Sequence, residues 1–232
     1  MKHILEGNIS VKAAILSPYR VVDELIVDEK KHTKDLSYII KQANERKIKV
    51  TKTTREAIDK LAEGTTHGGC IAICQDRTFQ TLSDLPKKES LFLALVEGIE
   101  DPFNFGYVLR NLYAAGCDGV LIGKRNWTSA AATVAKSSAG ASEIIPLIIM
   151  EDVESQLKQL KAAGITLICA ERKDAISLYT YTFPSKVCIA IGGEMRGLSL
   201  SLIHISSTKC FPNSNCLVVL GTLVLALSDC VS

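Results

Sequence analysis

Three stretches rich in small and polar residues follow apolar, strand-like runs, and they are where this sequence could bind a ligand. The first is DPFNFGYVLRN, residues 101–111, where Asp101 and Pro102 predict the start of a helix that contains Asn104 and Arg110. The second is the SSAGAS turn, residues 137–142, and the third is IGGEMRGLS, residues 191–199. Glycines in the third stretch permit tight turns, which would expose main-chain N–H and C=O groups to a ligand.

Each stretch also has a plain structural interpretation. Arg110 could be a solvated or salt-bridged arginine, and the SSAGAS turn is more typical of structure than of function. The glycine-rich stretch has neither the GxGxxG spacing nor the GxxxxGK[ST] pattern, so the sequence does not support a dinucleotide fold or a P-loop ATPase.

The elements that would position these stretches alternate between helix and strand. Residues 1–78 predict a small α/β unit, with helices near 9–16, 33–46 and 54–64 and strands at 22–29, 48–53 and 69–76. A polar linker at 79–90 precedes a second domain, 91–199, whose apolar strands at 91–98, 117–123, 143–150, 165–171 and 186–194 are separated by helices. This order predicts a parallel sheet covered on both faces, with ligands bound beyond the carboxyl ends of its strands.

Composition indicates a globular protein, and we expect a cytoplasmic location. It is 47% apolar and 22% charged, and its formal charge of +2 is too small to indicate nucleic-acid binding on its own. No secretory signal is recognisable, and the longest apolar run, 217–227, is shorter than the roughly 20 residues of a membrane-spanning helix. The short apolar run leads us to expect no membrane association. The cysteines in apolar runs show no paired ligand spacing, so we expect buried thiols and no metal site.

Taken in this order, DPFNFGYVLRN, SSAGA and IGGEMRGLS resemble the SpoU (TrmH) family of RNA ribose 2'-O-methyltransferases, which use S-adenosyl-L-methionine. The stretch from ILEGNISVKAAI to TTHGGCIAI resembles the N-terminal RNA-binding domain of that family. The resemblance covers roughly residues 1–199. It implies a trefoil-knotted α/β methyltransferase domain of the SPOUT type, preceded by a small α/β/α domain that binds RNA.

The resemblance also implies roles for individual residues. Arg110 and Asn104 would be catalytic, with Arg110 contacting the phosphate and hydroxyl and Asn104 positioning the target ribose or its loop. The cofactor would lie on loops that contain Ala170, Ile191, Gly192, Gly193, Glu194, Gly197 and Leu198. The partners implied are structured RNA, either rRNA or tRNA, and a second copy of the chain, with the site near the homodimer interface.

The reaction suits these residue types. Methyl transfer to a ribose is an in-line displacement, so holding the hydroxyl close to the methyl group supplies much of the rate. An arginine can stabilise the oxyanion that develops as the hydroxyl loses its proton. Because the 2'-hydroxyl distinguishes RNA from DNA, DNA is not an expected substrate.

The sequence departs from the family at about Leu200. We find neither the expected strand before Pro212 nor a Ser-Leu-Asn helix start, so we expect 200–232 to be an atypical tail that leaves the knot incomplete. Leu200–Ile205 is also the in-frame translation of CTGTCTCTTATACACATC, a transposon end used in sequencing libraries. Our hypothesis is that the reading frame enters chimeric sequence there, and the alternative is a diverged native tail.

Three functions remain open at this point. The first is an RNA 2'-O-methyltransferase, and the second is a non-catalytic RNA-binding protein with a defective methyltransferase domain. The third, a generic nucleotide-binding α/β protein, is less favoured because the phosphate-loop spacings are absent.

Overall fold

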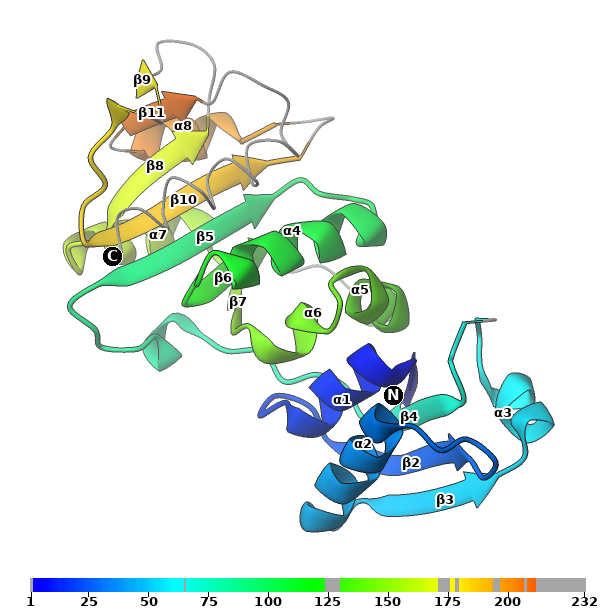
Figure 1. Cartoon of the computed structure of the whole chain (residues 1–232). Helices are drawn as coiled ribbons and strands as arrows, with labels where there is room; N and C mark the ends of the chain where they lie inside the picture. The colour runs from blue at the N-terminus through cyan, green and yellow to red at the C-terminus, as the bar shows by residue number, and fades with distance from the viewer. Residues whose placement is uncertain are drawn as a thin grey trace. The chain divides into compact units, whose positions relative to one another are not determined.

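The chain forms two compact units in the computed structural model, which describes residues 2–64, 66–123, 130–170, 176–177, 180–193 and 197–206, and the backbone of 208–211. Unit 1 comprises residues 1–78 and 126–144, and unit 2 comprises residues 79–125 and 145–232 (Figure 1). Within the described residues, no helix is long and apolar enough to cross a membrane.

Unit 1 is built on a four-stranded mixed sheet in the order β1-β4-β2-β3. Its strands are β1 (His3–Glu6), β2 (Val22–Asp28), β3 (Lys49–Thr53) and β4 (Cys70–Cys74). Its first three helices are α1 (Asn8–Leu16), α2 (Lys34–Glu45) and α3 (Arg55–Leu61). The predicted helices and the three predicted strands all form, whereas β1 was not predicted because four residues beside the N-terminus give too short a pattern.

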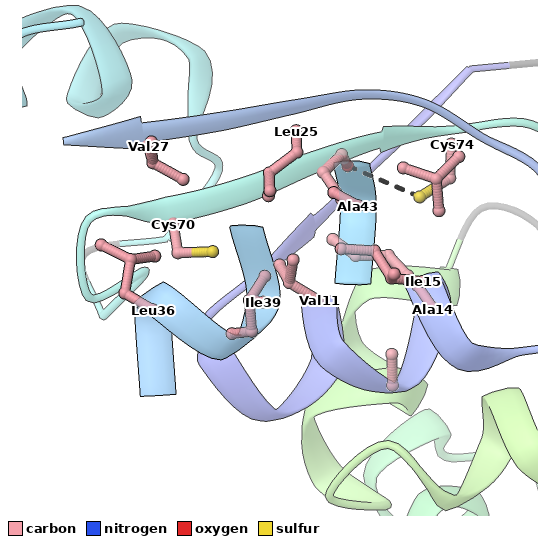
Figure 2. Close-up of a cluster of buried hydrophobic side chains, with 14 residues drawn as sticks. Val11, Ala14, Ile15, Leu25, Val27, Leu36, Ile39, Ala43, Cys70 and Cys74 are labelled. Carbon is pink, nitrogen blue, oxygen red and sulfur yellow. Dashed lines mark hydrogen bonds between the residues drawn. The ribbon is translucent and has the colours of Figure 1, made fainter. Parts of the chain in front are cut away.

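Helices α1 and α2 cover one face of this sheet with an apolar core. Figure 2 shows side chains of α1 and α2, among them Val11, Ile15 and Ile39, gathered against Leu25 and Cys74 of the strands. The side chains of Thr33 and Thr54 accept hydrogen bonds from the N–H groups of Leu36 and Ala57, which begins α2 and α3 at threonine N-caps.

A segment from the middle of the chain completes unit 1. Helices α5 (Ala131–Ser137) and α6 (Ala141–Ile144) pack on α1 and β1, and the SSAGAS turn lies between them. Ser138 and Ser142 are buried, and the Ser142 N–H donates to the Ser138 Oγ at 3.1 Å, so these hydroxyls hold the turn.

A buried ion pair fastens this segment to the N-terminal part of unit 1. The Arg20 guanidinium donates from Nε and Nη2 to the two carboxylate oxygens of Glu143, and its Nη1 donates to the Gln75 carbonyl at 2.8 Å. The side chains of Arg20 and Glu143 are 3% and 1% exposed. Arg77 is also buried, and its Nε donates to the Ser142 carbonyl at 2.9 Å.

We expect Glu143→Ala to destabilise unit 1 by about 3–5 kcal/mol, because it leaves the Arg20 charge buried without its partner. Urea unfolding followed by circular dichroism measures this change. The double variant Arg20→Met/Glu143→Leu removes both charges and should cost much less. A loss below about 1 kcal/mol for Glu143→Ala, the value of an exposed pair, would show that the pair contributes little.

Unit 2 is built on seven parallel strands in the order β7-β6-β5-β10-β8-β11-β9. The strands are β5 (Leu91–Glu97), β6 (Gly119–Gly123), β7 (Leu147–Met150), β8 (Thr166–Ala170), β9 (Ile176–Ser177), β10 (Lys186–Gly192) and β11 (Thr208–Phe211). A short 3₁₀ turn, η1 (Leu82–Asp84), precedes β5.

Helices lie on both faces of the parallel sheet. Leu157 and Leu160 of α7 (Val153–Ala162) and Leu202 of α8 (Leu200–Ile205) pack with Leu93 and Leu95 of β5 on one face. Helix α4 (Pro102–Ala114) crosses the other face (Figure 1). The prediction of an α/β protein with a covered parallel sheet is therefore confirmed. The trefoil knot and the domain limits stay predictions.

The structure corrects two expectations about strand positions. Glu143 and Ile144 belong to α6, so the strand predicted at 143–150 begins only at Leu147, after Pro146. The expectation that no strand precedes Pro212 is wrong, because β11 pairs in parallel with β8 over Thr208–Cys210. Residues 200–211 thus add α8 and β11 to unit 2, and residues 212–232 lie outside the described residues.

Candidate functional site

The order of the strands identifies the part of unit 2 where a ligand should bind. From β5 the chain proceeds outward to β6 and β7, and it then crosses to β8 on the other side, with β10 inserted between β5 and β8. Ligands of open parallel sheets bind beyond the carboxyl ends of the strands at such a reversal. The predicted site residues follow β5, β8 and β10, which are the three strands at this point.

Helix α4 begins at this edge and holds both predicted catalytic residues. The Asp101 carboxylate accepts hydrogen bonds from the N–H groups of Phe103 and Asn104, each at 3.2 Å, and Pro102 occupies the first turn, as predicted. Arg110 is exposed, and it makes no ion pair within the part of the chain that the structure describes. Its guanidinium is therefore accessible to a phosphate or a hydroxyl from solution.

The glycine-rich loop leaves β10 directly beside the start of α4. The Gly193 N–H donates to the Glu97 carbonyl at 2.7 Å, and the Gly197 N–H donates back to the Gly193 carbonyl at 2.9 Å. A Cβ on Gly193 would lie 2.1 Å from the Gly98 carbonyl oxygen, and a Cβ on Gly192 would lie 2.4 Å from the Gly197 carbonyl carbon. Glycine is required here because two main chains meet, whereas the sequence had suggested close approach of a ligand.

The expected cofactor residues Ala170 and Ile191 lie at the point where two strands part. Pairing between β8 and β10 ends at Cys169 and Ala190, and Ala170 and Ile191 are the next residues on each strand. Beyond this point β10 continues its pairing with β5 to Gly192. β8 and β10 therefore no longer pair at the carboxyl edge of the sheet.

The remaining predicted cofactor residues lie in the loop after β10. Gly197 has φ 62°, a left-handed conformation that favours glycine, and Leu198 packs against the core under α7 and α8. The structure therefore brings Ala170, Ile191, Gly192, Gly193, Gly197 and Leu198 to one edge with Asn104 at the start of α4. Glu194 lies outside the described residues.

Glu97 is a residue of this edge that the sequence reasoning missed. Besides its carbonyl contact with Gly193, its Oε2 accepts a hydrogen bond from the Ser199 N–H at 2.7 Å. The signal available in the sequence was an acidic residue at the last position of an otherwise apolar strand.

The described thiols take no part in this site. Cys70, Cys74, Cys117, Cys169 and Cys188 are free and buried, and burial raises the pKa of Cys70, Cys74 and Cys117 to about 12. Thiols with such pKa values are not nucleophiles at neutral pH. Among the described residues, no cluster of three or more His, Cys, Asp or Glu side chains could hold a metal ion.

An open parallel sheet with a ligand edge at its reversal point and a glycine-rich loop at that edge is typical of a cofactor-binding α/β protein. Residues 90–211 match the model of the SpoU rRNA Methylase family, and residues 4–80 match the model for RNA 2'-O ribose methyltransferase substrate binding. The chain belongs to the SpoU family of RNA ribose 2'-O-methyltransferases, which confirms the resemblance and its cofactor, S-adenosylmethionine. The match to residue 211 also shows that family-like sequence continues beyond Leu200.

Two relatives in bacteria show the extent of the similarity. A putative TrmH family tRNA/rRNA methyltransferase of Staphylococcus aureus (strain COL) is 30% identical over 89% of this chain and 83% of its own length. The 23S rRNA (guanosine-2'-O-)-methyltransferase RlmB of Shewanella oneidensis is 30% identical over 78% of this chain and 75% of its own length.

Solved structures share the fold. The SpoU methyltransferase AviRb from Streptomyces viridochromogenes, in complex with AdoMet, superposes with a TM-score of 0.78 at 16% identity over 100% of this chain and 91% of its own. An rRNA methyltransferase from Sinorhizobium meliloti superposes with a TM-score of 0.79 at 18% identity, over 98% of this chain and 87% of its own.

The residues at the carboxyl ends of β8 and β10 have the chemistry to hold an adenosine cofactor. Ile191, which is fully buried, and the half-buried Ala170 are the first residues beyond the paired part of these two strands. Main-chain groups at the end of such a ladder can bond to the edge of a flat base, and apolar side chains can pack on its faces.

Proposed function

We propose that this protein transfers the methyl group of S-adenosylmethionine to a ribose 2'-hydroxyl of structured RNA. The observation that supports this most is the junction of β5 and β10, where α4 and the glycine-rich loop begin at neighbouring carboxyl ends. Gly193 at the start of the loop is bonded to Glu97, four residues before the Asp101 N-cap of α4. A methyl donor on the loop and a hydroxyl held by α4 would therefore meet at one edge.

Each side chain has a defined part in the proposed reaction. The bound cofactor supplies an electrophilic methyl group, and Ala170, Ile191, Gly192, Gly193, Glu194, Gly197 and Leu198 would hold it. Asn104 would orient the ribose. Arg110 would bind the adjacent phosphate and stabilise the negative charge that develops on the 2'-oxygen as its proton passes to solvent water. Positioning of the hydroxyl against the methyl group would supply much of the remaining rate.

The substrate we propose is rRNA, with tRNA as the second candidate. The name of the Shewanella relative specifies 23S rRNA, and that of the Staphylococcus relative includes both classes. Unit 1 would bind the RNA, because its residues match the substrate-binding model. Methylation of unmodified transcripts of each class by the purified protein, followed by nucleoside mass spectrometry, distinguishes them. A cytoplasmic location is part of the proposal, consistent with the free thiols.

A homodimer is also part of the proposal, and we place its interface on α4. Phe103 and Tyr107 are 55% and 43% exposed, and they follow one another at helical spacing on the face that includes Arg110. Large exposed aromatic side chains are typical of the centres of interfaces. An interface on this face would lie beside the proposed catalytic arginine.

We expect Tyr107→Glu to shift the protein from dimer to monomer, because it places a charge within an apolar contact. Light scattering coupled to size-exclusion chromatography measures the mass. Tyr38→Glu on α2 is the matched control, since Tyr38 is also 43% exposed. A Tyr107→Glu protein that stays dimeric would exclude this face of α4.

The alternative function is a non-catalytic RNA-binding protein. The observation that favours it is that the match to the methylase model stops at residue 211, before the expected Ser-Leu-Asn motif. Calorimetry with S-adenosylmethionine, combined with a methylation assay, separates the two functions. Tight RNA binding without cofactor binding would support the alternative.

A further inference from the structure

A single residue at the end of β5, Glu97, contacts both ends of the glycine-rich loop. Its main-chain carbonyl accepts a hydrogen bond from the Gly193 N–H, and its Oε2 accepts one from the Ser199 N–H, each at 2.7 Å. Gly193 is where the loop leaves β10, and Ser199 is the N-cap of α8. Glu97 therefore accepts hydrogen bonds from the residues at both ends of the loop, Gly193 and Ser199.

The Glu97 carboxylate also caps α8 from a different element. The Ser199 side chain makes no capping hydrogen bond, and the first turn of α8 contains no acidic residue. A carboxylate that accepts the N-cap N–H, as in a capping box, satisfies a donor there, and its charge is favourable at a helix N-terminus. The direction in which the chain leaves the loop thus depends on a side chain of β5.

The same stretch of chain determines where α4 begins. The Gly98 carbonyl lies against Gly193 so closely that no Cβ would fit, and the Asp101 carboxylate caps α4 three residues later. Residues 97–101 therefore contact the proposed cofactor loop at one end and the proposed catalytic helix at the other.

We propose that Glu97 is a positioning residue, which holds the glycine-rich loop on the end of β5 in register with α4. Through the loop it sets the affinity for S-adenosylmethionine. The inference rests on the proposed function for the identity of the ligand, but the contact with Ser199 can be tested in the protein alone.

Three substitutions separate the reach of this side chain from its charge. Glu97→Gln keeps an oxygen acceptor at the same distance without the charge, Glu97→Asp keeps the charge but withdraws it by one methylene, and Glu97→Ala removes both. Glu154→Ala on α7 is the matched control, because Glu154 is an exposed glutamate of the same unit.

The first measurement is amide hydrogen exchange by NMR on the cofactor-free protein. We expect the Ser199 amide to exchange faster in Glu97→Asp and Glu97→Ala, while the Gly193 amide stays protected because its acceptor is a main-chain carbonyl. The second is calorimetry with S-adenosylmethionine, in which these two variants should bind about ten- to a hundredfold more weakly. Glu97→Gln and Glu154→Ala should remain close to the unmodified chain.

The two measurements distinguish failure of this inference from failure of the proposed function. Unchanged cofactor affinity in Glu97→Asp, and in Glu97→Ala where that variant folds, would overturn the inference, whether or not Ser199 exchange changes. Unmodified protein that does not bind S-adenosylmethionine would contradict the proposed function instead. Because Glu97→Asp is a mild change, it decides the question even if Glu97→Ala does not fold.

Discussion

Arg110→Ala should lower the rate of methyl transfer at least about a hundredfold, the usual loss when a donor to a developing oxyanion is removed. Arg110 is exposed on α4 and contacts none of the described residues of the glycine-rich loop through a hydrogen bond, so cofactor affinity should hardly change. Single-turnover transfer from tritiated S-adenosylmethionine to RNA measures the rate, and calorimetry measures the affinity.

Two further variants make this result specific. Arg110→Lys should also be slow, because an ammonium group cannot reproduce the two parallel hydrogen bonds of a guanidinium. Lys158→Ala, which removes an exposed cation from α7, should leave the rate unchanged. Substantial turnover by Arg110→Ala would exclude Arg110 as the catalytic arginine.

Gly193→Ala should destabilise unit 2 and weaken cofactor binding together. The added Cβ would lie 2.1 Å from the Gly98 carbonyl oxygen and 2.5 Å from its carbon, so the end of β5 or the loop must move. Overpacking usually destabilises a protein by about 1–3 kcal/mol. Because the Cβ meets main chain, we expect unit 2 to lose about 3 kcal/mol of stability or more. Urea unfolding and calorimetry with S-adenosylmethionine measure the two losses.

Gly123→Ala provides the matched control for this change. Gly123 also ends a strand of the same sheet, and a Cβ there would meet nothing within 4 Å. The stability of the Gly123→Ala protein should therefore change by no more than about 0.5 kcal/mol. A Gly193→Ala protein as stable as Gly123→Ala would mean that the contact between Gly98 and Gly193 is not tight.

Much of the fold was predictable from the sequence because its strands are strongly apolar and its helices have clear start signals. Asp101 forms the predicted N-cap, and Thr33 and Thr54 cap helices at the predicted starts. The long runs at 91–98 and 186–194 become β5 and β10. Two of the predicted chemical stretches, DPFNFG and IGG, meet at one edge because the strands before them, β5 and β10, are neighbours.

What the sequence did not predict depends on contacts between distant residues. Pairing of β4 with β1 and β2 is antiparallel, and no local pattern specifies that direction. The packing of α5 and α6 within unit 1 depends on the ion pair between Arg20 and Glu143, which are 123 residues apart. The role of Glu97 depends likewise on Ser199, 102 residues away.

The segment after Leu200 shows why an apolar run without charges is hard to interpret. LSLIHI forms α8, because Leu202 is buried in the core under α7 and β8, and the Lys161 ammonium donates to the Ile205 carbonyl at 2.9 Å. The hypothesis that chimeric sequence begins at about Leu200 stays a prediction, although the match to the methylase model continues to residue 211. Long-read sequencing of the source locus tests it, and a locus that reproduces LSLIHIS would exclude the adapter as the origin of that stretch.

The central claim is methyl transfer to a ribose hydroxyl, and nucleoside analysis after methylation tests it most directly. The purified protein is incubated with unmodified rRNA or tRNA transcripts and labelled S-adenosylmethionine, and the RNA is then digested to nucleosides for mass spectrometry. We predict label in 2'-O-methylated nucleosides, formed at least about a hundredfold more slowly when Arg110→Ala replaces the unmodified chain. Label in base-methylated nucleosides, or no incorporation by protein that binds S-adenosylmethionine and both RNA classes, would contradict the claim.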